Sequence, residues 1–262
     1  MPGNELEVCR FLFVNRGQIH LNHIGRVEDV AAPMVGSDRY SSLQSLDDLF
    51  KISTSHSGKK ADVYLNDRGV SIKQSGGSFA FNRLQRANLF EVYTSLGLTH
   101  PEAIIAKIDR EVHKFHQGLL PSRNQPWQTF FSEQDFETLM IFLMLKGSPN
   151  QGLSSHPAEF ILEASQTVSS NRDLALYSFD EYFERYKLKF EVAIRRQWIG
   201  QESDSEHSRA LGIARKVENA PWVFDDVIGQ PKLHKTTQRR WREDFPESDR
   251  RTVYFLMIEK KK

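Results

Sequence analysis

Residues 59–77 read KKADVYLNDRGVSIKQSGG, and this stretch predicts a β-hairpin. Apolar and polar residues alternate on both sides of the turn sequence NDRG, which is the pattern of strands with one buried face. We expect Leu65 to pair with Val70 and Val63 with Ile72, because this register puts all four apolar side chains on one face.

The same register is expected to bring polar and charged side chains together on the opposite face. It places Asp62 opposite Lys73 and Tyr64 opposite Ser71, with directly opposed Cβ atoms about 5 Å apart. On an ordinary sheet edge, such an acid and lysine form a cross-strand ion pair worth ~0.2–1 kcal/mol. The other interpretation is catalytic, because a carboxylate can hold Mg²⁺ while a lysine stabilises the charge that develops in phosphodiester hydrolysis.

The hairpin resembles the PD-(D/E)xK nucleases, and within them the type II restriction endonucleases. In that family an acidic residue ends one strand and an acid-x-lysine triplet lies on the next, often after a helix that carries a glutamate. Asp62 matches the first acid and Lys73 the lysine. The sequence departs from the pattern at Ala61, in the place of the name-giving proline, and at Ser71, in the place of the second acid. The segments QSGGSFAFNRLQRA and RRTVYFLMIEKK also look like segments of restriction endonucleases.

The resemblance implies an α/β fold with a restriction-endonuclease-like core, in which helices flank a central mixed sheet, and a helical elaboration. It implies Mg²⁺-dependent, sequence-specific hydrolysis of double-stranded DNA by a homodimer, with a DNA methyltransferase as functional companion. Asp62 would bind the metal, Lys73 would position and stabilise the nucleophile, and Ser71 would bind a metal-bound water. The alternative is a non-catalytic DNA-binding or structural protein that keeps the same scaffold.

A carboxylate from elsewhere in the chain has to replace the acid that is missing at Ser71. Glu5 lies on the apolar stripe of a helix predicted for residues 4–16, where a carboxylate is costly unless it is paired or bound to a metal. We therefore assign Glu5 as the second metal ligand and catalytic acid. Glu7 and Glu91 are the alternatives.

Two stretches carry the expected DNA contacts. Glycines 76 and 77 allow a backbone to approach a phosphate closely, and Ser78 is expected to begin a helix on which Arg83 and Arg86 form one stripe. Residues 231–244, PKLHKTTQRRWRED, form a second basic cluster. The predicted DNA-binding residues are Lys59, Lys60, Gln74, Ser75, Ser78, Asn82, Arg83, Arg86, Lys235, Gln238, Arg239, Arg240 and Arg242.

Hydrophobic periodicity and capping residues define the other elements, and we expect one domain over residues 1–262. It would consist of the catalytic hairpin at 61–74, a helical region at about 79–187, and C-terminal strands with a basic loop at about 188–262. Helices are predicted at 4–16, 41–52, 81–97, 101–118, 132–147 and 178–187, and strands at 188–196 and 251–259.

Composition limits the surroundings in which the chain works. It has 35 Lys and Arg against 34 Asp and Glu, a net charge of +1, so any nucleic-acid surface has to be local. Cys9 is the only cysteine, which suits a reducing compartment, and we expect a cytoplasmic protein. The longest apolar run, FETLMIFLMLKG, is shorter than the ~20 residues of a membrane span, and the N-terminus lacks the features of a signal peptide.

Overall fold

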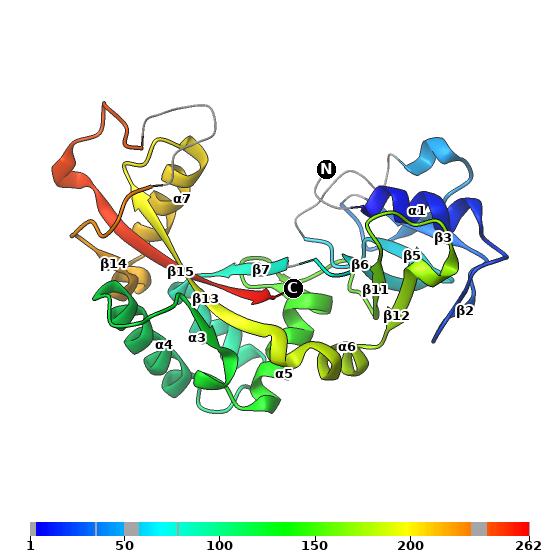
Figure 1. The fold of residues 1–262 in the computed structure, drawn as a ribbon, viewed down its shortest axis with the longest axis horizontal. Coiled ribbons are helices and arrows are strands. Elements are labelled where there is room, and N and C mark those ends of the chain that lie inside the picture. Colours follow the sequence, from blue (N-terminus) through cyan, green and yellow to red (C-terminus); the bar gives the residue numbers. More distant parts are fainter. Residues whose placement is uncertain (1–3, 35, 50–57, 78, 232–239, 262) are drawn as a thin grey trace. The chain divides into compact units, whose positions relative to one another are not determined.

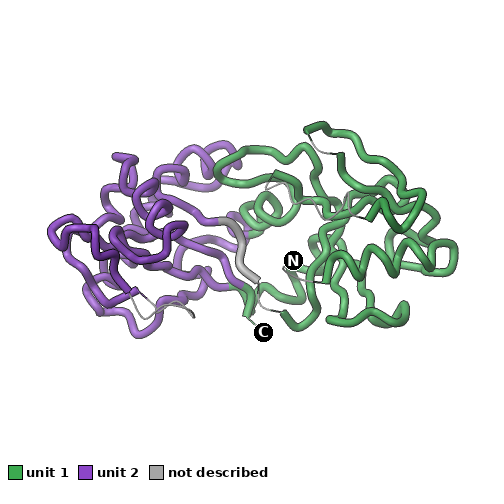
Figure 2. The backbone as a smooth tube through the Cα atoms, turned by 90° about the horizontal axis from the view of Figure 1, so that it is seen from above, with its two compact units in different colours: residues 1–79, 137–190, 260–262 green, residues 80–136, 191–259 purple. Residues whose placement is uncertain are grey.

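The structure is a computed structural model that describes residues 4–34, 36–49, 58–77, 79–231 and 240–261 (Figure 1). Its contacts divide the chain into two compact units (Figure 2). Unit 1 comprises residues 1–79, 137–190 and 260–262, and unit 2 comprises residues 80–136 and 191–259. The sequence alone does not suggest this division, because each unit is assembled from segments that are distant along the chain.

Unit 1 is built on a six-stranded mixed sheet in the order β12-β11-β6-β5-β3-β4. Neighbouring strands are antiparallel except β6 and β11, which run parallel. The mixed sheet with flanking helices confirms the α/β class expected from the sequence. The strands are β3 (Val30–Pro33), β4 (Tyr40–Ser42), β5 (Val63–Leu65), β6 (Arg68–Gln74), β11 (Phe160–Ala164) and β12 (Leu174–Tyr177). Two small ribbons, β1 (His20–Leu21) with β2 (Gly25–Arg26) and β9 (Gly147–Ser148) with β10 (Gly152–Leu153), accompany the sheet.

The first helix, α1 (Glu5–Val14), covers one face of this sheet. Its buried residues belong to the same core as the apolar residues of the hairpin. The alternation in the sequence therefore predicts correctly which side chains of β5 and β6 join this core, although Tyr64 and Ser71 on the opposite face are buried as well. The shared core residues are Val8, Cys9, Leu12 and Phe13 of α1 and Val63, Leu65, Val70 and Ile72 of the hairpin.

The register of the hairpin differs from the prediction by two residues. Leu65 pairs with Arg68 and Val63 with Val70, so the turn contains only Asn66 and Asp67. Both turn residues have positive φ, 47° and 66°, as in the two-residue turns whose twist matches that of the flanking strands. A shift by two residues keeps every side chain on its predicted face, but Asp62 no longer lies opposite Lys73.

Unit 2 has a second sheet in the order β14-β15-β13-β8, with β7 also paired to β15. Helix α7 (Asp204–Ala214) packs on one face through Ala210 and Ile213, which contact Val253 and Phe255. On the other face, His116 at the end of α4 (Pro101–His116) hydrogen-bonds Tyr254 (Figure 1). The strands are β7 (Phe79–Leu84), β8 (Asn124–Pro126), β13 (Phe190–Ile199), β14 (Val223–Phe224) and β15 (Arg251–Lys260).

Several predicted elements are confirmed. They include α1, α4, the strands β13 and β15, and α6 (Phe179–Tyr186), where Ser178 and Glu181 form a reciprocal capping box. The long apolar helix is confirmed as α5 (Glu133–Ile141), which continues as a π-helical turn over Phe142–Lys146.

Other predicted elements are wrong. Residues 81–97 do not form one helix, because β7 extends to Leu84 and α3 (Arg86–Ser95) begins only afterwards. The two phenylalanines of FAFNRL suit a strand, and pairing with β15 decides the structure. Of the helix predicted over residues 41–52, the described part forms the end of β4 and a 3₁₀ turn at Leu46–Asp48, and residues 50–52 lie outside it. The strands β8, β11 and β12 lie in the region expected to be helical. None of the described helices has the length and apolar character required to cross a membrane.

Asn66 determines the hairpin turn, and we expect Asn66→Ala to lower the free energy of unfolding by about 2–3 kcal/mol. Its Oδ1 accepts hydrogen bonds from the N–H groups of Glu28 (2.8 Å) and Asp29 (3.1 Å), and its Nδ2 donates to the carbonyl of Arg26 (2.7 Å). Alanine loses these bonds and tolerates positive φ poorly. Urea unfolding followed by circular dichroism measures the change.

The matched control is Asp67→Gly, since glycine adopts a φ of 66° freely. This variant is expected to stay within about 0.5 kcal/mol of the wild type. Equal stabilities of Asn66→Ala and the wild type would show that the turn does not fix the register.

Candidate active site

Asp62 lies at an irregularity just before β5. Its backbone N–H donates to the carbonyl oxygen of Val70 (2.8 Å), although Val70 is the ladder partner of Val63. Asp62 and Val63 therefore both lie opposite Val70, which is the arrangement of a β-bulge. Bulges change the direction in which side chains point. The carboxylate of Asp62 accepts a hydrogen bond from the backbone N–H of Ile72 (2.7 Å). The bulge and this bond determine the position of Asp62. The predicted pairing, in which Asp62 lies directly opposite Lys73, is wrong.

Ser71 connects Asp62 to Lys73. The Lys73 ammonium donates to Ser71 Oγ (2.8 Å) and to the carbonyl of Ile72 (3.2 Å), and Ser71 Oγ donates to Asp62 Oδ2 (3.4 Å). Ser71 is only 2% exposed, whereas Asp62 and Lys73 are half-buried. Among the described residues, the acid and the lysine form no direct ion pair, so the hydroxyl that replaces the missing acid lies between them.

Glu5 lies in the first turn of α1, within electrostatic reach of the hairpin charges. The desolvation caused by surrounding atoms raises the pKa of Glu5 and Asp62 raises it further, while Lys73 and Lys59 lower it. The side chain nevertheless keeps an exposed surface, so a ligand can reach it. The charges of Glu5 on α1, Asp62 at the bulge before β5 and Lys73 on β6 are thus close enough to interact.

The two alternatives to Glu5 lie in different surroundings. Glu7 is exposed on α1 and lines a surface cavity with Arg10. Glu91 is exposed on α3, in unit 2. Neither contributes to the charges that shift the pKa of Glu5.

The donor set fits a hard divalent cation. The described residues contain no group of three or more His, Cys, Asp or Glu side chains arranged to hold a metal. Mg²⁺, however, usually takes one or two protein carboxylates and keeps several waters. The negative charge of Asp62 raises the pKa of Glu5, and a cation between the two carboxylates would relieve that repulsion. Glu5 and Asp62 are therefore the residues that could hold it.

Sequence reasoning missed Glu163, the neighbour of Lys73 in the parallel ladder of β11 and β6. It is 4% exposed and accepts hydrogen bonds from Lys260 (3.0 Å) and from the hydroxyl of Tyr186 (2.6 Å). The Lys260 ammonium also lies 3.6 Å from the ring centroid of Tyr186. Because Lys260 already balances its charge, Glu163 is a buried structural acid beside the site. A single acid within the apolar run FILEA was the available signal.

The predicted DNA contacts of unit 1 surround the hairpin. The Lys60 ammonium donates to the carbonyl of Leu143 (2.7 Å). Burial lowers the pKa of Lys60 to about 8, and Lys73 adds to this effect while Asp62 opposes it. Lys59 and Gln74 are half-buried, and Ser75 is exposed at a turn that Gly76 makes with a φ of 66°. Ser78 lies outside the described residues.

The predicted contacts of unit 2 have mixed outcomes. Arg83 lies on strand β7 and not on a helix with Arg86, so the expected stripe is wrong. Arg83 is exposed, with its guanidinium 5.9 Å from the ring centroid of Phe255. Arg86 instead binds both carboxylate oxygens of Asp109 (2.9–3.1 Å) and the carbonyl of Glu218 (2.9 Å), which leaves it little capacity for a phosphate.

The basic cluster at 231–244 is described only in part. Arg240 is exposed and donates to Gln230. Arg242 forms ion pairs with Asp204 (2.6 Å) and Asp244 (3.3 Å), so acids already balance its charge. The backbone of Asn82 lies in β7, and its side chain is outside the described part, as are Lys235, Gln238 and Arg239.

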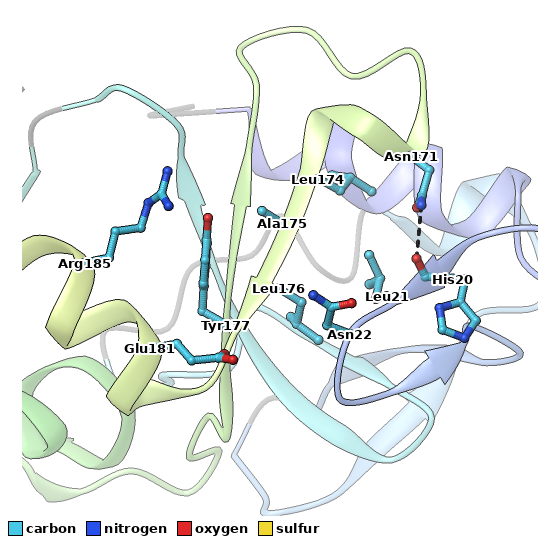
Figure 3. Close-up of a pocket in the computed structure, with 10 residues that line it drawn as sticks. All are labelled: His20, Leu21, Asn22, Asn171, Leu174, Ala175, Leu176, Tyr177, Glu181 and Arg185. Atoms are coloured by element: carbon cyan, nitrogen blue, oxygen red, sulfur yellow. Dashed lines mark hydrogen bonds between the residues drawn. The ribbon is translucent and has the colours of Figure 1, made fainter.

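A larger cavity of about 540 Å³ lies elsewhere in unit 1, between the β1 segment, β12 and α6 (Figure 3). Asn171 donates across it to the carbonyl of His20 (3.1 Å), and Tyr177, Glu181 and Arg185 line its other side. No residue of the predicted site lines this cavity. The candidate active site is therefore defined by interacting charges and not by this cavity.

Comparisons of the chain with protein-family models, curated proteins and solved structures find no match. The function has to be argued from the residues of the chain itself.

The titration of Glu5 tests whether these charges converge. We expect Asp62→Asn to lower the pKa of Glu5, because it removes a negative charge that raises it, and Lys73→Met to raise it, because it removes a positive charge that lowers it. Carboxyl-carbon NMR over a pH series measures both shifts, and added Mg²⁺ should shift the titration to lower pH. Glu7→Gln is the control and should leave it unchanged. An identical Glu5 titration in all variants would contradict the proposed proximity.

Proposed function

We propose that the chain is a Mg²⁺-dependent endonuclease that hydrolyses phosphodiester bonds of double-stranded DNA, as type II restriction endonucleases do. The observation that carries the proposal is the convergence of two carboxylates and one lysine on the end of the hairpin, with Glu5 and Asp62 near Lys73. The position of Asp62 at a bulge and of Glu5 on a preceding helix also supports the resemblance seen in the sequence.

The proposed roles follow from the chemistry of these side chains. Asp62 and Glu5 would hold the cation, which when bound polarises a phosphate oxygen and lowers the pKa of a coordinated water. Lys73 would place its ammonium beside the scissile phosphate and stabilise the additional negative charge of the transition state. The half-buried position of Lys73 strengthens this interaction, because electrostatic effects grow where water is excluded.

Ser71 has a positioning role in this proposal. Its hydroxyl accepts a hydrogen bond from the Lys73 ammonium and donates one to Asp62. It therefore sets the distance between the Lys73 ammonium and the Asp62 carboxylate. A carboxylate at this buried position would instead pair directly with Lys73 and neutralise it. The serine therefore leaves the charge of Lys73 available for a phosphate, while Glu5 supplies the second acid.

The finer features of the proposal come from the resemblance. They are recognition of a specific sequence, action as a homodimer in which each subunit cuts one strand, and a companion DNA methyltransferase. Dimerisation would match the two-fold symmetry of a palindromic site.

Plasmid cleavage tests the proposal. We expect wild-type protein to cut duplex DNA with Mg²⁺ but not with EDTA. Asp62→Asn and Lys73→Met should each slow the single-turnover rate by about 10²–10³, the usual effect of removing one transition-state contact. Lys114→Met is the matched control, because Lys114 is an exposed lysine of α4 in unit 2 that pairs with Glu111 one turn earlier. It should cut at the wild-type rate.

Two results would contradict the proposal. If the wild type leaves DNA and RNA intact with every divalent ion tried, the chain is instead a non-catalytic DNA-binding or structural protein. If the wild type cuts and both hairpin variants cut equally well while remaining folded by circular dichroism, the active site lies elsewhere.

A further inference from the structure

Unit 2 contains a cavity of about 390 Å³ whose lining is strongly basic. It is lined by residues of β13 and β15, of the first turns of α7 and of β7. The charged lining residues are Arg83, Arg123, Arg195, Arg196, Arg209 and Glu206, which is five positive charges against one negative. The whole chain has a net charge of only +1, so five arginines against one glutamate at one cavity are a local excess of positive charge.

The arginines of this cavity differ in how far the protein neutralises them. Arg195 pairs with Glu259, and Arg196 donates to the hydroxyl of Tyr254 (3.1 Å). Among the described residues, Arg83 and Arg209 form no ion pair. Burial lowers the pKa of Arg83 and the positive charge of Arg209 lowers it further, while Glu206 opposes both, so a single carboxylate faces two like charges. An anionic ligand would supply further negative charge.

Buried polar atoms without hydrogen-bond partners also gather at this cavity. Five such side-chain atoms occur in the described part of the chain, and three of them belong to lining residues: Arg195 Nε, Gln197 Oε1 and Gln201 Nε2. Gln197 and Gln201 are 5% and 2% exposed. Each buried polar atom left unpaired costs roughly 1–3 kcal/mol. A ligand or an ordered water in the cavity would remove this cost.

The unpaired atoms restrict the chemistry of the ligand. A phosphodiester offers only acceptors, which suit the arginines but not the Oε1 acceptor of Gln197. A ligand that pairs with all of these atoms without a bridging water presents a donor as well as acceptors, as the edge of a nucleobase does. The rings of Phe115, Trp198 and Phe255 also line the cavity and offer surfaces for an aromatic base.

We propose that this cavity binds one nucleotide, with its phosphate on Arg83 and Arg209 and its base edge at Gln197 and Gln201. The volume falls within the range of small-molecule sites, about 300–1,000 Å³. It is far too small to enclose a duplex, whose major groove alone is about 12 Å wide. The ligand is either a free nucleotide or one nucleotide of a DNA strand that is turned out of its stack.

This site is separate from the residues proposed to cleave DNA. All its lining residues belong to unit 2, whereas Glu5, Asp62 and Lys73 belong to unit 1. The inference therefore stands whether or not unit 1 hydrolyses DNA, and a binding experiment without divalent ions tests it alone.

Isothermal titration calorimetry of the full chain in EDTA tests the proposal. The probes are inorganic phosphate, the four deoxynucleoside monophosphates, a single-stranded oligonucleotide and a duplex of the same sequence. We expect at least one nucleotide-containing probe to bind about tenfold or more tightly than phosphate. Binding of monophosphates identifies a free nucleotide as the ligand, and binding of oligonucleotides alone identifies a nucleotide within a strand.

Three variants assign the contacts. Arg209→Met should weaken nucleotide binding by about tenfold or more, whereas Arg215→Met, at the exposed end of α7, should leave it unchanged. Gln197→Met replaces the unpaired acceptor by an apolar group of similar length, which favours folding. It should reduce nucleotide binding to the level of phosphate binding. Arg83→Met, at an exposed position, is the second arginine variant and should act like Arg209→Met.

The outcomes that overturn the proposal are distinct. If phosphate binds as tightly as every nucleotide probe, the cavity is only an anion site. If Arg209→Met and Arg83→Met bind like Arg215→Met, or if Gln197→Met binds nucleotides like the wild type, the nucleotide does not occupy this cavity. None of these results bears on cleavage by unit 1.

Discussion

The candidate active site depends on the two-residue turn between β5 and β6. Asn66 and Asp67 adopt left-handed backbone conformations, and this fixes Val63 opposite Val70. The last residues of β6, Ser71 to Gln74, therefore extend beyond the final residue pair with β5. Asp62 enters the space beside this extension, where the Ile72 N–H and the Ser71 hydroxyl bind its carboxylate. In the longer turn expected from the sequence, Val63 would occupy the position opposite Ile72 and Asp62 would face Lys73 directly.

The sequence predicts the faces of the hairpin but not its register, for a physical reason. Successive side chains of a strand point to opposite faces, so the alternation of apolar residues repeats every two residues. A shift of the pairing by two residues therefore leaves every side chain on the same face. Register depends on the turn, and the conformations of Asn66 and Asp67 are chosen partly by long-range bonds to Glu28 and Asp29. Glu5 could be recognised because its place on an apolar stripe is a local property. Glu163 could not be placed beside Lys73, because the parallel pairing of β11 with β6 joins distant segments.

The helix predicted over residues 81–97 shows how tertiary pairing overrides a local pattern. Apolar residues at helical spacing continue from α3 back through Leu84, yet residues 79–84 pair with β15 as strand β7. Arg83 therefore lies on a sheet, where its guanidinium joins arginines from β13 and α7 at one cavity. Arg86, only three residues later, is half-buried and held by Asp109 of α4. Sequence reasoning found both basic residues but could not tell the available cation from the structural one.

The distribution of charge suggests how binding and chemistry are divided along the chain. In unit 1, each cation near the hairpin has a local contact: Lys73 bonds Ser71, Lys60 bonds Leu143, and Lys260 bonds Glu163. Such groups are held in place, which suits catalysis, because pre-organised charges need little rearrangement when the reaction occurs. In unit 2, Arg83 and Arg209 form no ion pair among the described residues, which suits binding, because an anion would stabilise both charges. Affinity and cleavage would then depend on different residues, and a substitution in one unit should change one property without the other.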